Sequence, residues 1–321
     1  MPERRVAVIL AAGLGTRMKS SLPKVMHEVL GKPMIGHVVQ TALSVDCDEI
    51  AVVVGHGREL VEGYLRETFP EAPLSFHVQH EMLGTGDAVR SALAAYEEGN
   101  PQVAVLCGDV PNLPPLLLRR AFTLREDANT PVVVITAIAP AGTSYGRIVR
   151  DAQGFVQKIV EYRDADEATR DIREINSGSY VFSGRFLREQ IHNLDTDNAQ
   201  GEFYLTDLVE LASKGAHPAH ALQGSDIRPL DGVNTRLDLA AANAVARTQR
   251  NRDLMLAGVT IIAPESTWVD ADSIVETDVT LEPNVVLRGR CVIARGAHIE
   301  AGVRLEDRHV SPGERVLATV Q

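Results

Sequence analysis

Glycine and positive charge gather directly after the first apolar run of the chain, in the stretch LAAGLGTRMKSSLPK from Leu10 to Lys24. Glycine lets the backbone approach an anion closely, so that several N–H groups can converge on it. Arg17 adds a planar fork of donors that suits phosphate oxygens, and Lys24 adds a second cation. A tight strand-to-helix connection would explain the glycines alone, but the two cations favour a polyphosphate site.

The stretch matches neither of the two common phosphate-loop patterns. GxGxxG would need a glycine where Met18 stands, and GxxxxGK[ST] is absent from the chain. A second polar turn, VLCGD, ends at Asp109 after another apolar run. Ligands of open α/β sheets bind beyond the carboxyl ends of the strands. We therefore expect both turns to lie at one site.

Residues 1–234 alternate short apolar runs with amphipathic stretches, which predicts an α/β layered domain with a mostly parallel sheet. Buried strands are expected at 6–10, 49–55, 103–109 and 131–139, and helices at 34–44 and 86–99. A connector helix is expected at 235–258, because this stretch is rich in Ala, Leu and Arg and ends at Gly258.

Residues 259–321 follow a different period. An apolar residue recurs every six positions, at Val269, Val275, Leu281, Leu287, Ile293, Ile299 and Leu305. Four positions after each of the first six stands a smaller or branched residue, at Ser273, Val279, Val285, Cys291, Ala297 and Val303. This period predicts a hexapeptide β-helix rather than a β-sandwich. Three hexads make one triangular coil, so slightly over two coils are expected.

The composition is that of a globular protein without a polyanion-binding surface. The chain has 321 residues, is 45% hydrophobic and carries a net charge of -11, so neither nucleic acid nor a membrane is an expected partner. The three cysteines, Cys47, Cys107 and Cys291, form no CxxC pair, and a reducing, cytoplasmic location is expected. The start MPERRVAVILAAGLG only faintly imitates a signal peptide.

Several motifs together resemble one enzyme family. LAAGLGTRM…LPK is similar to the signature of sugar-1-phosphate nucleotidylyltransferases. QHEMLGTGDAV, GDVP, YGRIVR, KIVEYRDA, REINSGSYVF, NAQGEFYLTD and DGVNTR follow in the order found in the bacterial N-acetylglucosamine-1-phosphate uridylyltransferase/glucosamine-1-phosphate acetyltransferase family, called GlmU. The resemblance implies a Rossmann-like nucleotidyltransferase domain, a connector helix and a left-handed parallel β-helix.

The resemblance also implies roles for individual residues. Arg17 and Lys24 would hold the triphosphate and stabilise the pyrophosphate that leaves. The nucleotide would be bound by Leu10, Ala11, Ala12 and Gly13 through the backbone, and the uracil would be read by Gln79, Gly84 and Thr85. A glutamine amide both donates and accepts, which suits a pyrimidine edge. Outside the family context, Gln79 would be interpreted as a surface polar residue.

A metal ion and a sugar are implied in the same way. Asp109 and Asn234 would share one Mg²⁺, an ion that prefers hard oxygen ligands. Without the family, Asp109 would be interpreted as a turn residue and Asn234 as the N-cap of the connector helix. The N-acetylglucosamine pocket would include Gly146, Glu161 and Asn176. Glu161 alone would be interpreted as an ordinary exposed carboxylate.

The implied reaction joins UTP and N-acetylglucosamine-1-phosphate to give UDP-N-acetylglucosamine and pyrophosphate. Acetyltransferase activity is expected to be absent, since the family's β-helix continues for many more coils. The chain is then a natural single-function form or a truncated one, and the tail HVSPGERVLATVQ, which leaves the hexad pattern, favours a natural end. Alternatives are another sugar phosphate or nucleotide, such as glucose-1-phosphate or dTTP, and a non-catalytic nucleotide-sugar-binding module. A homotrimer through the β-helix is expected.

Overall fold

The computed structural model describes residues 3–318, which divide into two compact units. Of the described residues, the first unit contains 3–26 and 34–234, and the second contains 27–33 and 235–318. The division at 234/235 coincides with the start of the connector helix. Residues 27–33, which lie within the expected first domain, fold with the second unit instead.

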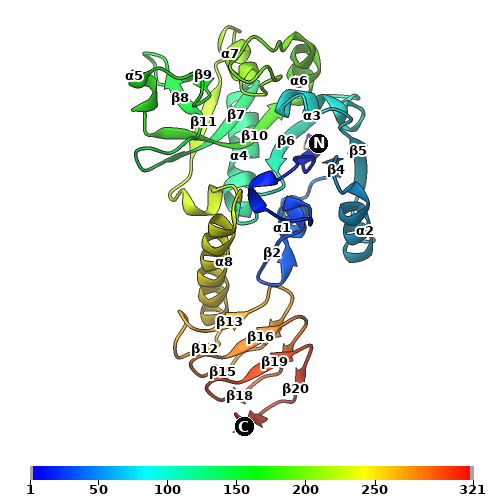
Figure 1. Cartoon of the computed structure of the whole chain (residues 1–321), viewed down its shortest axis with the longest axis vertical. Coiled ribbons are helices and arrows are strands. Elements are labelled where there is room, and N and C mark those ends of the chain that lie inside the picture. Colours follow the sequence, from blue (N-terminus) through cyan, green and yellow to red (C-terminus); the bar gives the residue numbers. More distant parts are fainter. Residues whose placement is uncertain (1–2, 319–321) are drawn as a thin grey trace. The chain divides into compact units, whose positions relative to one another are not determined.

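The first unit is built on a nine-stranded mixed sheet. Seven of its strands follow the order β11-β7-β10-β6-β1-β4-β5, and β8 and β9 lie off this path. Figure 1 shows this sheet with helices on either side. Its strands are β1 (Arg5–Leu10), β4 (Glu49–Val54), β5 (Leu74–Val78), β6 (Gln102–Cys107), β7 (Val132–Ile138), β8 (Arg147–Arg150), β9 (Val156–Val160), β10 (Glu174–Ser183) and β11 (His220–Gln223). All pairs among β6, β1, β4 and β5 are parallel, whereas β10 runs antiparallel to both of its path neighbours. The predicted α/β fold is confirmed.

Each face of the sheet is covered by its own apolar core. In β1, the alternation of a strand sends Ala7 and Ile9 into one core and Val6 and Val8 into the other. One core receives residues of α1 (Met34–Ser44), α2 (Arg58–Thr68) and α4 (Pro115–Ala128), and the other those of α3 (Thr85–Ser91), α6 (Gly184–Gln190) and α7 (Asp207–Ser213). Burial on both faces explains why these strands are continuous apolar runs. A short helix, α5 (Glu167–Arg170), has no buried residue.

The helix expected at 86–99 is shorter in the structure. It ends at Ser91, and a 3₁₀ turn follows at Leu93–Tyr96. The Tyr96 side chain is fully buried, and its hydroxyl donates to the carbonyl of Val89 at 2.9 Å. This contact draws the chain back onto the preceding turn, which a straight helix would not allow.

The second unit combines α8 (Arg236–Leu256) with a three-sided parallel β-helix. Its strands pair in sheets of four, three and three, with the orders β12-β15-β18-β21, β13-β16-β19 and β14-β17-β20. The strands are β12 (Thr260–Ile261), β13 (Trp268–Val269), β14 (Ile274–Val275), β15 (Thr280–Leu281), β16 (Val286–Arg288), β17 (Val292–Ile293), β18 (His298–Ile299), β19 (Arg304–Glu306), β20 (His309–Val310) and β21 (Arg315–Val316). The stack confirms the β-helix that the hexads predict and is consistent with the left-handed form that the family resemblance implies.

The expected number of coils, slightly over two, is too low. The three sheets give three full coils and the first strand of a fourth. The hexad count missed Ile261, which precedes Val269 by a longer step, and Val310, which follows Leu305 by a shorter one. The part of the tail through Val316 therefore continues the β-helix although it leaves the strict six-residue period.

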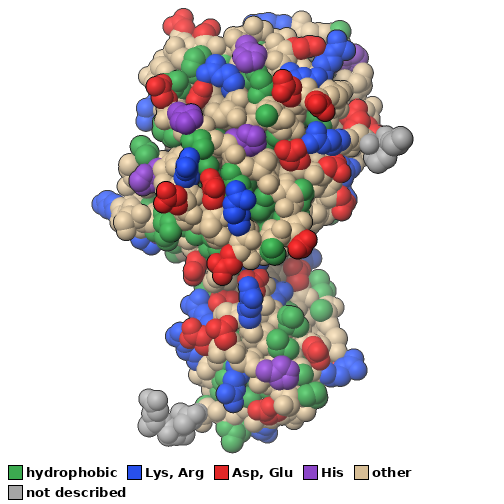
Figure 2. Space-filling view, turned by 90° about the vertical axis from the view of Figure 1, so that its right-hand side faces the viewer, with side chains coloured by type: hydrophobic (Ala, Val, Ile, Leu, Met, Phe, Trp, Pro, Cys, Tyr) green, Lys and Arg blue, Asp and Glu red, His purple; other side chains and the backbone are tan. Residues whose placement is uncertain are grey.

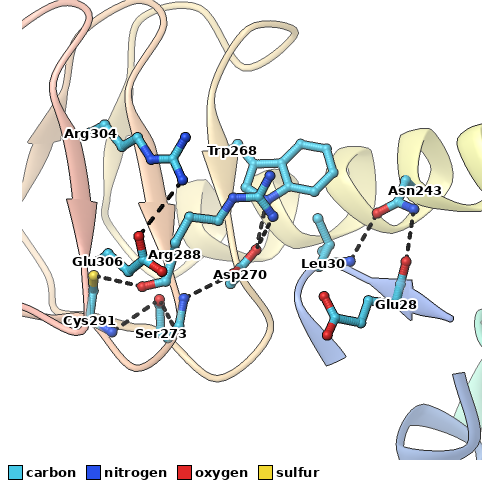
Figure 3. A network of polar contacts seen from close by, with 11 residues as sticks. Glu28, Leu30, Asn243, Trp268, Asp270, Ser273, Arg288, Cys291, Arg304 and Glu306 are labelled. Carbon is cyan, nitrogen blue, oxygen red and sulfur yellow. Dashed lines mark hydrogen bonds and ion pairs between the residues drawn. The ribbon is translucent and has the colours of Figure 1, made fainter. Parts of the chain in front are cut away.

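A short hairpin of the second unit, β2 (Glu28–Val29) with β3 (Lys32–Pro33), is fixed by α8 and the first coil. Asn243 of α8 accepts from the Leu30 N–H at 2.9 Å and donates to the Glu28 carbonyl at 3.2 Å (Figure 3). Gly31 has φ +72°, and a Cβ there would stand 2.3 Å from a carboxylate oxygen of Asp270. Only glycine fits this turn, since both its backbone angle and the space require it.

The Asp270 carboxylate is the centre of the polar network in Figure 3. It is 4% exposed. It accepts hydrogen bonds from the Trp268 indole at 2.6 Å and from the Gly289 N–H at 2.9 Å, and it pairs with Arg288 at 3.4 Å. The Arg288 guanidinium also lies 4.8 Å from the centroid of the Trp268 ring. One carboxylate thus satisfies donors from two successive coils.

We expect Asp270→Ala to lower the free energy of unfolding of the second unit by about 1–3 kcal/mol, because it leaves half-buried donors without an acceptor. Denaturant unfolding followed by Trp268 fluorescence measures the loss. The matched control is Arg304→Ala, which removes an exposed ion pair with Glu306 at 3.7 Å and should cost less than about 0.5 kcal/mol. Equal effects of the two substitutions would contradict the role given to Asp270.

Candidate active site

The two polar turns identified in the sequence lie side by side at one edge of the main sheet. β1 and β6 are parallel neighbours, with Leu10 opposite Cys107, and the Gly108 N–H donates to the Leu10 carbonyl at 2.9 Å. The chain builds β4 and β5 on one side of β1 and then places β6 on the other. The carboxyl ends of β1 and β6 are therefore the point at which strand order reverses, where α/β proteins bind ligands.

Four predicted site residues from distant parts of the chain meet at this point. The Lys24 ammonium forms an ion pair with the Asp109 carboxylate and lies 3.3 Å from the side-chain oxygen of Asn234. The Arg17 guanidinium donates to the same Asn234 oxygen at 2.8 Å. Two cationic side chains are therefore in direct contact with two side chains whose oxygens could bind a metal ion. This is the arrangement expected for a site that binds phosphate and a metal ion.

Hydrogen bonds to the backbone fix the positions of Asp109 and Asn234. The Val233 N–H donates to the Asp109 carbonyl at 2.9 Å, which joins the segment before α8 to the end of β6. The Asn234 amide donates to the Gly232 carbonyl at 3.2 Å, so that its oxygen faces Lys24 and Arg17. The alternative that Asn234 caps α8 is wrong. Thr235 is the N-cap and forms a capping box with Asp238.

The donor set suits a hard divalent cation. Asp109 and Asn234 both offer oxygen, and the Lys24 ammonium already contacts both side chains, so a positive charge is accommodated between them. Among residues 3–318, no group of three or more His, Cys, Asp or Glu side chains could hold a metal ion. Two protein oxygens with the remaining positions filled by phosphate and water is the usual arrangement for Mg²⁺.

A cavity of about 390 Å³ opens beside this cluster. This volume lies in the range of small-molecule sites. Its lining includes Leu10, Thr85, Asp109, Gly146, Glu161, Asn176 and Asn234, all of them predicted site residues. It also includes Cys107, whose thiol pKa burial raises to about 12, so that this residue is a neutral part of the wall.

The three residues assigned to the sugar lie together in the cavity wall. The Asn176 N–H donates to the Gly146 carbonyl at 2.9 Å, and a Cβ on Gly146 would stand 3.3 Å from both carboxylate oxygens of Glu161. Glu161 is not an ordinary exposed carboxylate, because it is half-buried and burial raises its pKa. The Asn176 side chain is held at both ends, by the Tyr180 hydroxyl at 2.6 Å and the Gly178 N–H at 3.0 Å.

The residues assigned to the base form a compact loop. Gln79 follows β5 and is 5% exposed, so the interpretation as a surface residue is wrong. Its amide donates to the Gly84 carbonyl at 3.1 Å. Gly84 has φ +109°, and a Cβ there would lie 2.7 Å from the Phe203 carbonyl. Thr85 begins α3 and accepts from the Leu205 N–H at 3.1 Å.

The glycine-rich turn combines buried and exposed residues. The Ala11 N–H is used within the sheet, since it donates to the Val53 carbonyl at 2.8 Å. Ala12 is buried, whereas Gly13 is exposed, and a Cβ there would meet no atom within 4 Å. The space beside Gly13 is therefore open.

Three residues of the site were not identified from the sequence, although each lies within a quoted motif. Tyr180, in REINSGSYVF, lines the cavity and holds Asn176. Asp231, in DGVNTR, accepts from the Tyr145 hydroxyl at 2.9 Å. Asp87, in QHEMLGTGDAV, accepts from the Gln79 amide at 3.0 Å. The signal that could have found them is their place two to eight positions from residues already assigned.

Known proteins resemble this chain over most of its length. The model of the MobA-like NTP transferase domain matches residues 7–211. The bifunctional protein GlmU of Streptomyces coelicolor is 43% identical over 316 residues, which are 98% of this chain and 65% of that protein. GlmU of Cutibacterium acnes is 42% identical over 94% of this chain and 73% of its own length. The chain thus spans about two thirds of the length of these relatives.

Solved structures support the fold. UDP-glucose pyrophosphorylase in complex with UDP-glucose superposes with a TM-score of 0.62 and 20% identity, covering 76% of this chain and 99% of that chain. The apo form of a UDP-glucose pyrophosphorylase superposes with a TM-score of 0.64 and 19% identity. At this identity the similarity concerns the fold.

An acidic group borders the cavity next to Thr206. Asp207 begins α7, and burial, together with the nearby carboxylates of Asp195, Glu210 and Asp164, raises its pKa to about 6. A carboxyl group with a raised pKa binds its proton more tightly in the folded state. Its contribution to stability is therefore complete below its ordinary pKa of 3.8 and is lost as the pH rises through about 6.

We expect Asp207→Asn to raise the melting temperature more at pH 7 than at pH 4.5, by a margin of about 1–3 °C. Thermal unfolding of both proteins at both pH values measures this. Asp226→Asn is the control with the opposite sign, since a hydrogen bond from Arg228 lowers the pKa of Asp226. A margin of zero for Asp207→Asn would contradict the burial of its charge.

Proposed function

The chain belongs to the MobA-like NTP transferases and, among them, to the GlmU family, and we propose that it transfers the uridylyl group of UTP to N-acetylglucosamine-1-phosphate. The products are UDP-N-acetylglucosamine and pyrophosphate. The observation that carries this proposal is the contact of Lys24 and Arg17 with Asp109 and Asn234 beside a cavity that contains Glu161 and Asn176. The proposal concerns uridylyl transfer alone, because the chain matches only part of its relatives.

The proposed reaction needs positioning and charge neutralisation rather than a base. The sugar phosphate is already an anionic nucleophile, and its oxygen attacks the α-phosphorus of UTP while the bond to the β-phosphate oxygen breaks. Charge accumulates on the pyrophosphate that leaves. Arg17 is exposed, and one of its five N–H groups is used by Asn234, so the others are available to phosphate oxygens.

Lys24 is positioned to stabilise the charge that develops on the pyrophosphate. Its ammonium is held by Asp109 and Asn234, and phosphate oxygens that enter the site compete with these partners for its N–H groups. Asp109 and Asn234 would hold the Mg²⁺, which when bound neutralises phosphate charge. With these oxygens engaged by the ion, the Lys24 ammonium would be available to the pyrophosphate. These residues stabilise charge that develops only in the transition state, which raises kcat.

The sugar pocket has the chemistry for an acetamido sugar. Glu161 offers a carboxylate that accepts from sugar hydroxyls, and Asn176 presents an amide held in one orientation by Tyr180 and Gly178. A fixed amide discriminates better than a mobile one, because a ligand that cannot pair with it leaves it unsatisfied. We propose that these two residues favour N-acetylglucosamine-1-phosphate over the glucosamine and glucose phosphates.

Two further proposals accompany the enzymatic one. We propose that the β-helix mediates a homotrimer, since three flat faces of short strands are available for packing between copies. We place the reaction in the cytoplasm, where UTP is made. No helix among the described residues has the length and apolar character to cross a membrane. The face in Figure 2 shows acidic and basic side chains interspersed, without a broad field of one sign.

We expect pyrophosphate release with UTP, Mg²⁺ and N-acetylglucosamine-1-phosphate. With glucosamine-1-phosphate or glucose-1-phosphate, kcat/KM should be lower by a factor of about 100 or more. A coupled pyrophosphate assay measures the rates, and a parallel reaction with acetyl-CoA tests acetyl transfer. Absence of release with UTP and each sugar phosphate would contradict the proposal. Preference for glucose-1-phosphate or dTTP would assign the same chemistry to another substrate.

We expect Asp109→Asn to lower kcat by more than about 100-fold, because it removes the charged oxygen ligand and the partner of Lys24 while keeping the shape of the side chain. The melting temperature should change little. The control is Asp127→Asn, at an exposed position on α4, with unchanged kcat. Chelation of divalent cations should abolish the wild-type rate, and Mg²⁺ should restore it. A rate for Asp109→Asn within tenfold of wild type would remove Asp109 from the metal site.

A further inference from the structure

The Gln79 side chain is locked in one orientation. Its amide N–H groups donate to the Gly84 carbonyl at 3.1 Å and to the Asp87 carboxylate at 3.0 Å. Both partners are acceptors only, so a rotation of the amide by 180° would set its oxygen against two other oxygens. The orientation of the amide therefore follows from its two partners. The group that Gln79 can offer to a ligand is its carbonyl oxygen.

Asp87 is itself held in place. Arg90 donates to one of its carboxylate oxygens at 2.6 Å, which leaves the other for Gln79. The Arg90 guanidinium lies 4.9 Å from the centroid of the Phe203 ring. The Phe203 backbone joins the same loop, since its N–H donates to Leu83 and its carbonyl accepts from Gly86, both at 2.8 Å. The carboxylate, whose side chain is 13% exposed, has little freedom to leave Gln79.

We propose that Asp87 is a positioning residue for base selection, which acts by making Gln79 present an acceptor to the base. This inference rests on the proposed function, and it takes Gln79 to face the nucleotide base, as the family resemblance implies. Uracil offers an N–H at N3, which pairs with a carbonyl oxygen. Cytosine has a lone pair at N3, which is repelled by the same oxygen. Thymine shares the N3–H of uracil and is not distinguished from it by this contact.

The orientation matters because an amide free to rotate would serve either base. Gln79 alone can donate or accept, so it carries no preference between uracil and cytosine. The preference arises when Asp87 and Gly84 occupy the N–H groups. Cytosine then meets an acceptor that cannot turn away, and specificity comes from the repulsive arrangement as much as from the attractive one.

The test is Asp87→Asn, which nearly keeps the size of the side chain but lets it donate as well as accept. This removes one of the two acceptors that hold Gln79, so its amide can rotate at the expense of the Gly84 contact and present its N–H groups to cytosine. We measure kcat/KM for UTP, CTP and dTTP with one sugar phosphate. The UTP/CTP ratio should fall by about tenfold or more, whereas the UTP/dTTP ratio should stay within about twofold of wild type. A role in folding alone would lower all three values together.

A double-mutant cycle assigns the effect to Gln79. In a Gln79→Ala background, Asp87→Asn should leave the UTP/CTP ratio unchanged, since no amide remains to be oriented. Arg90→Gln removes the donor that holds the Asp87 carboxylate and should also lower the UTP/CTP ratio. This variant replaces Asp87→Asn in the test if Asp87→Asn does not fold. The matched control is Glu189→Gln, which removes an exposed ion pair with Arg185 within α6 and should leave both ratios unchanged.

The outcomes separate this inference from the proposed function. If the wild-type protein releases no pyrophosphate from UTP with any sugar phosphate, the proposed function is wrong. If it uses UTP in preference to CTP, and Asp87→Asn and Arg90→Gln both keep the wild-type UTP/CTP ratio, the positioning role of Asp87 is wrong and the proposed function stands. A fall of the ratio that persists in the Gln79→Ala background also overturns the role, because it then acts through another residue.

Discussion

The ion pair between the Lys24 ammonium and the Asp109 carboxylate, closed by the Asn234 amide oxygen, is the contact on which the rest of the site depends. Each partner follows a different element, and the three lie far apart in the sequence. They can meet only because β1 and β6 are parallel neighbours and the segment before α8 pairs with the end of β6. The whole doubly covered sheet serves to place these three side chains within one hydrogen bond of each other.

This arrangement also resolves an electrostatic problem. A site for two polyanionic substrates needs cations, and neighbouring cations repel one another. Here Arg17 and Lys24 share the Asn234 oxygen, and Asp109 balances one of the two positive charges. Only one positive charge of the cluster is therefore unbalanced, and the cations become available when phosphate oxygens and a divalent cation compete for the same partners.

The sequence predicts the parts of this structure that obey a local rule. Parallel strands buried on both faces read as runs of Val and Ile, and a β-helix reads as an apolar residue at every sixth position. The rule failed where a tertiary contact decides the outcome. The buried Tyr96 hydroxyl shortens the helix after Thr85, and the hairpin around Gly31 folds with the second unit because it packs on Asp270 and Asn243. Neither contact produces a periodic pattern in the sequence.

The same limit explains which site residues were found. Residues proposed to contact a ligand stand in motifs whose residue types already suggest their chemistry, as Arg17 and Lys24 do. Asp87, Tyr180 and Asp231 act on other side chains, and their effect depends on an orientation that only the three-dimensional structure shows. A glutamine in a sequence is both donor and acceptor. It becomes an acceptor toward its ligand only once Asp87 and Gly84 have taken its N–H groups, so the selectivity of the site resides in the neighbours of Gln79.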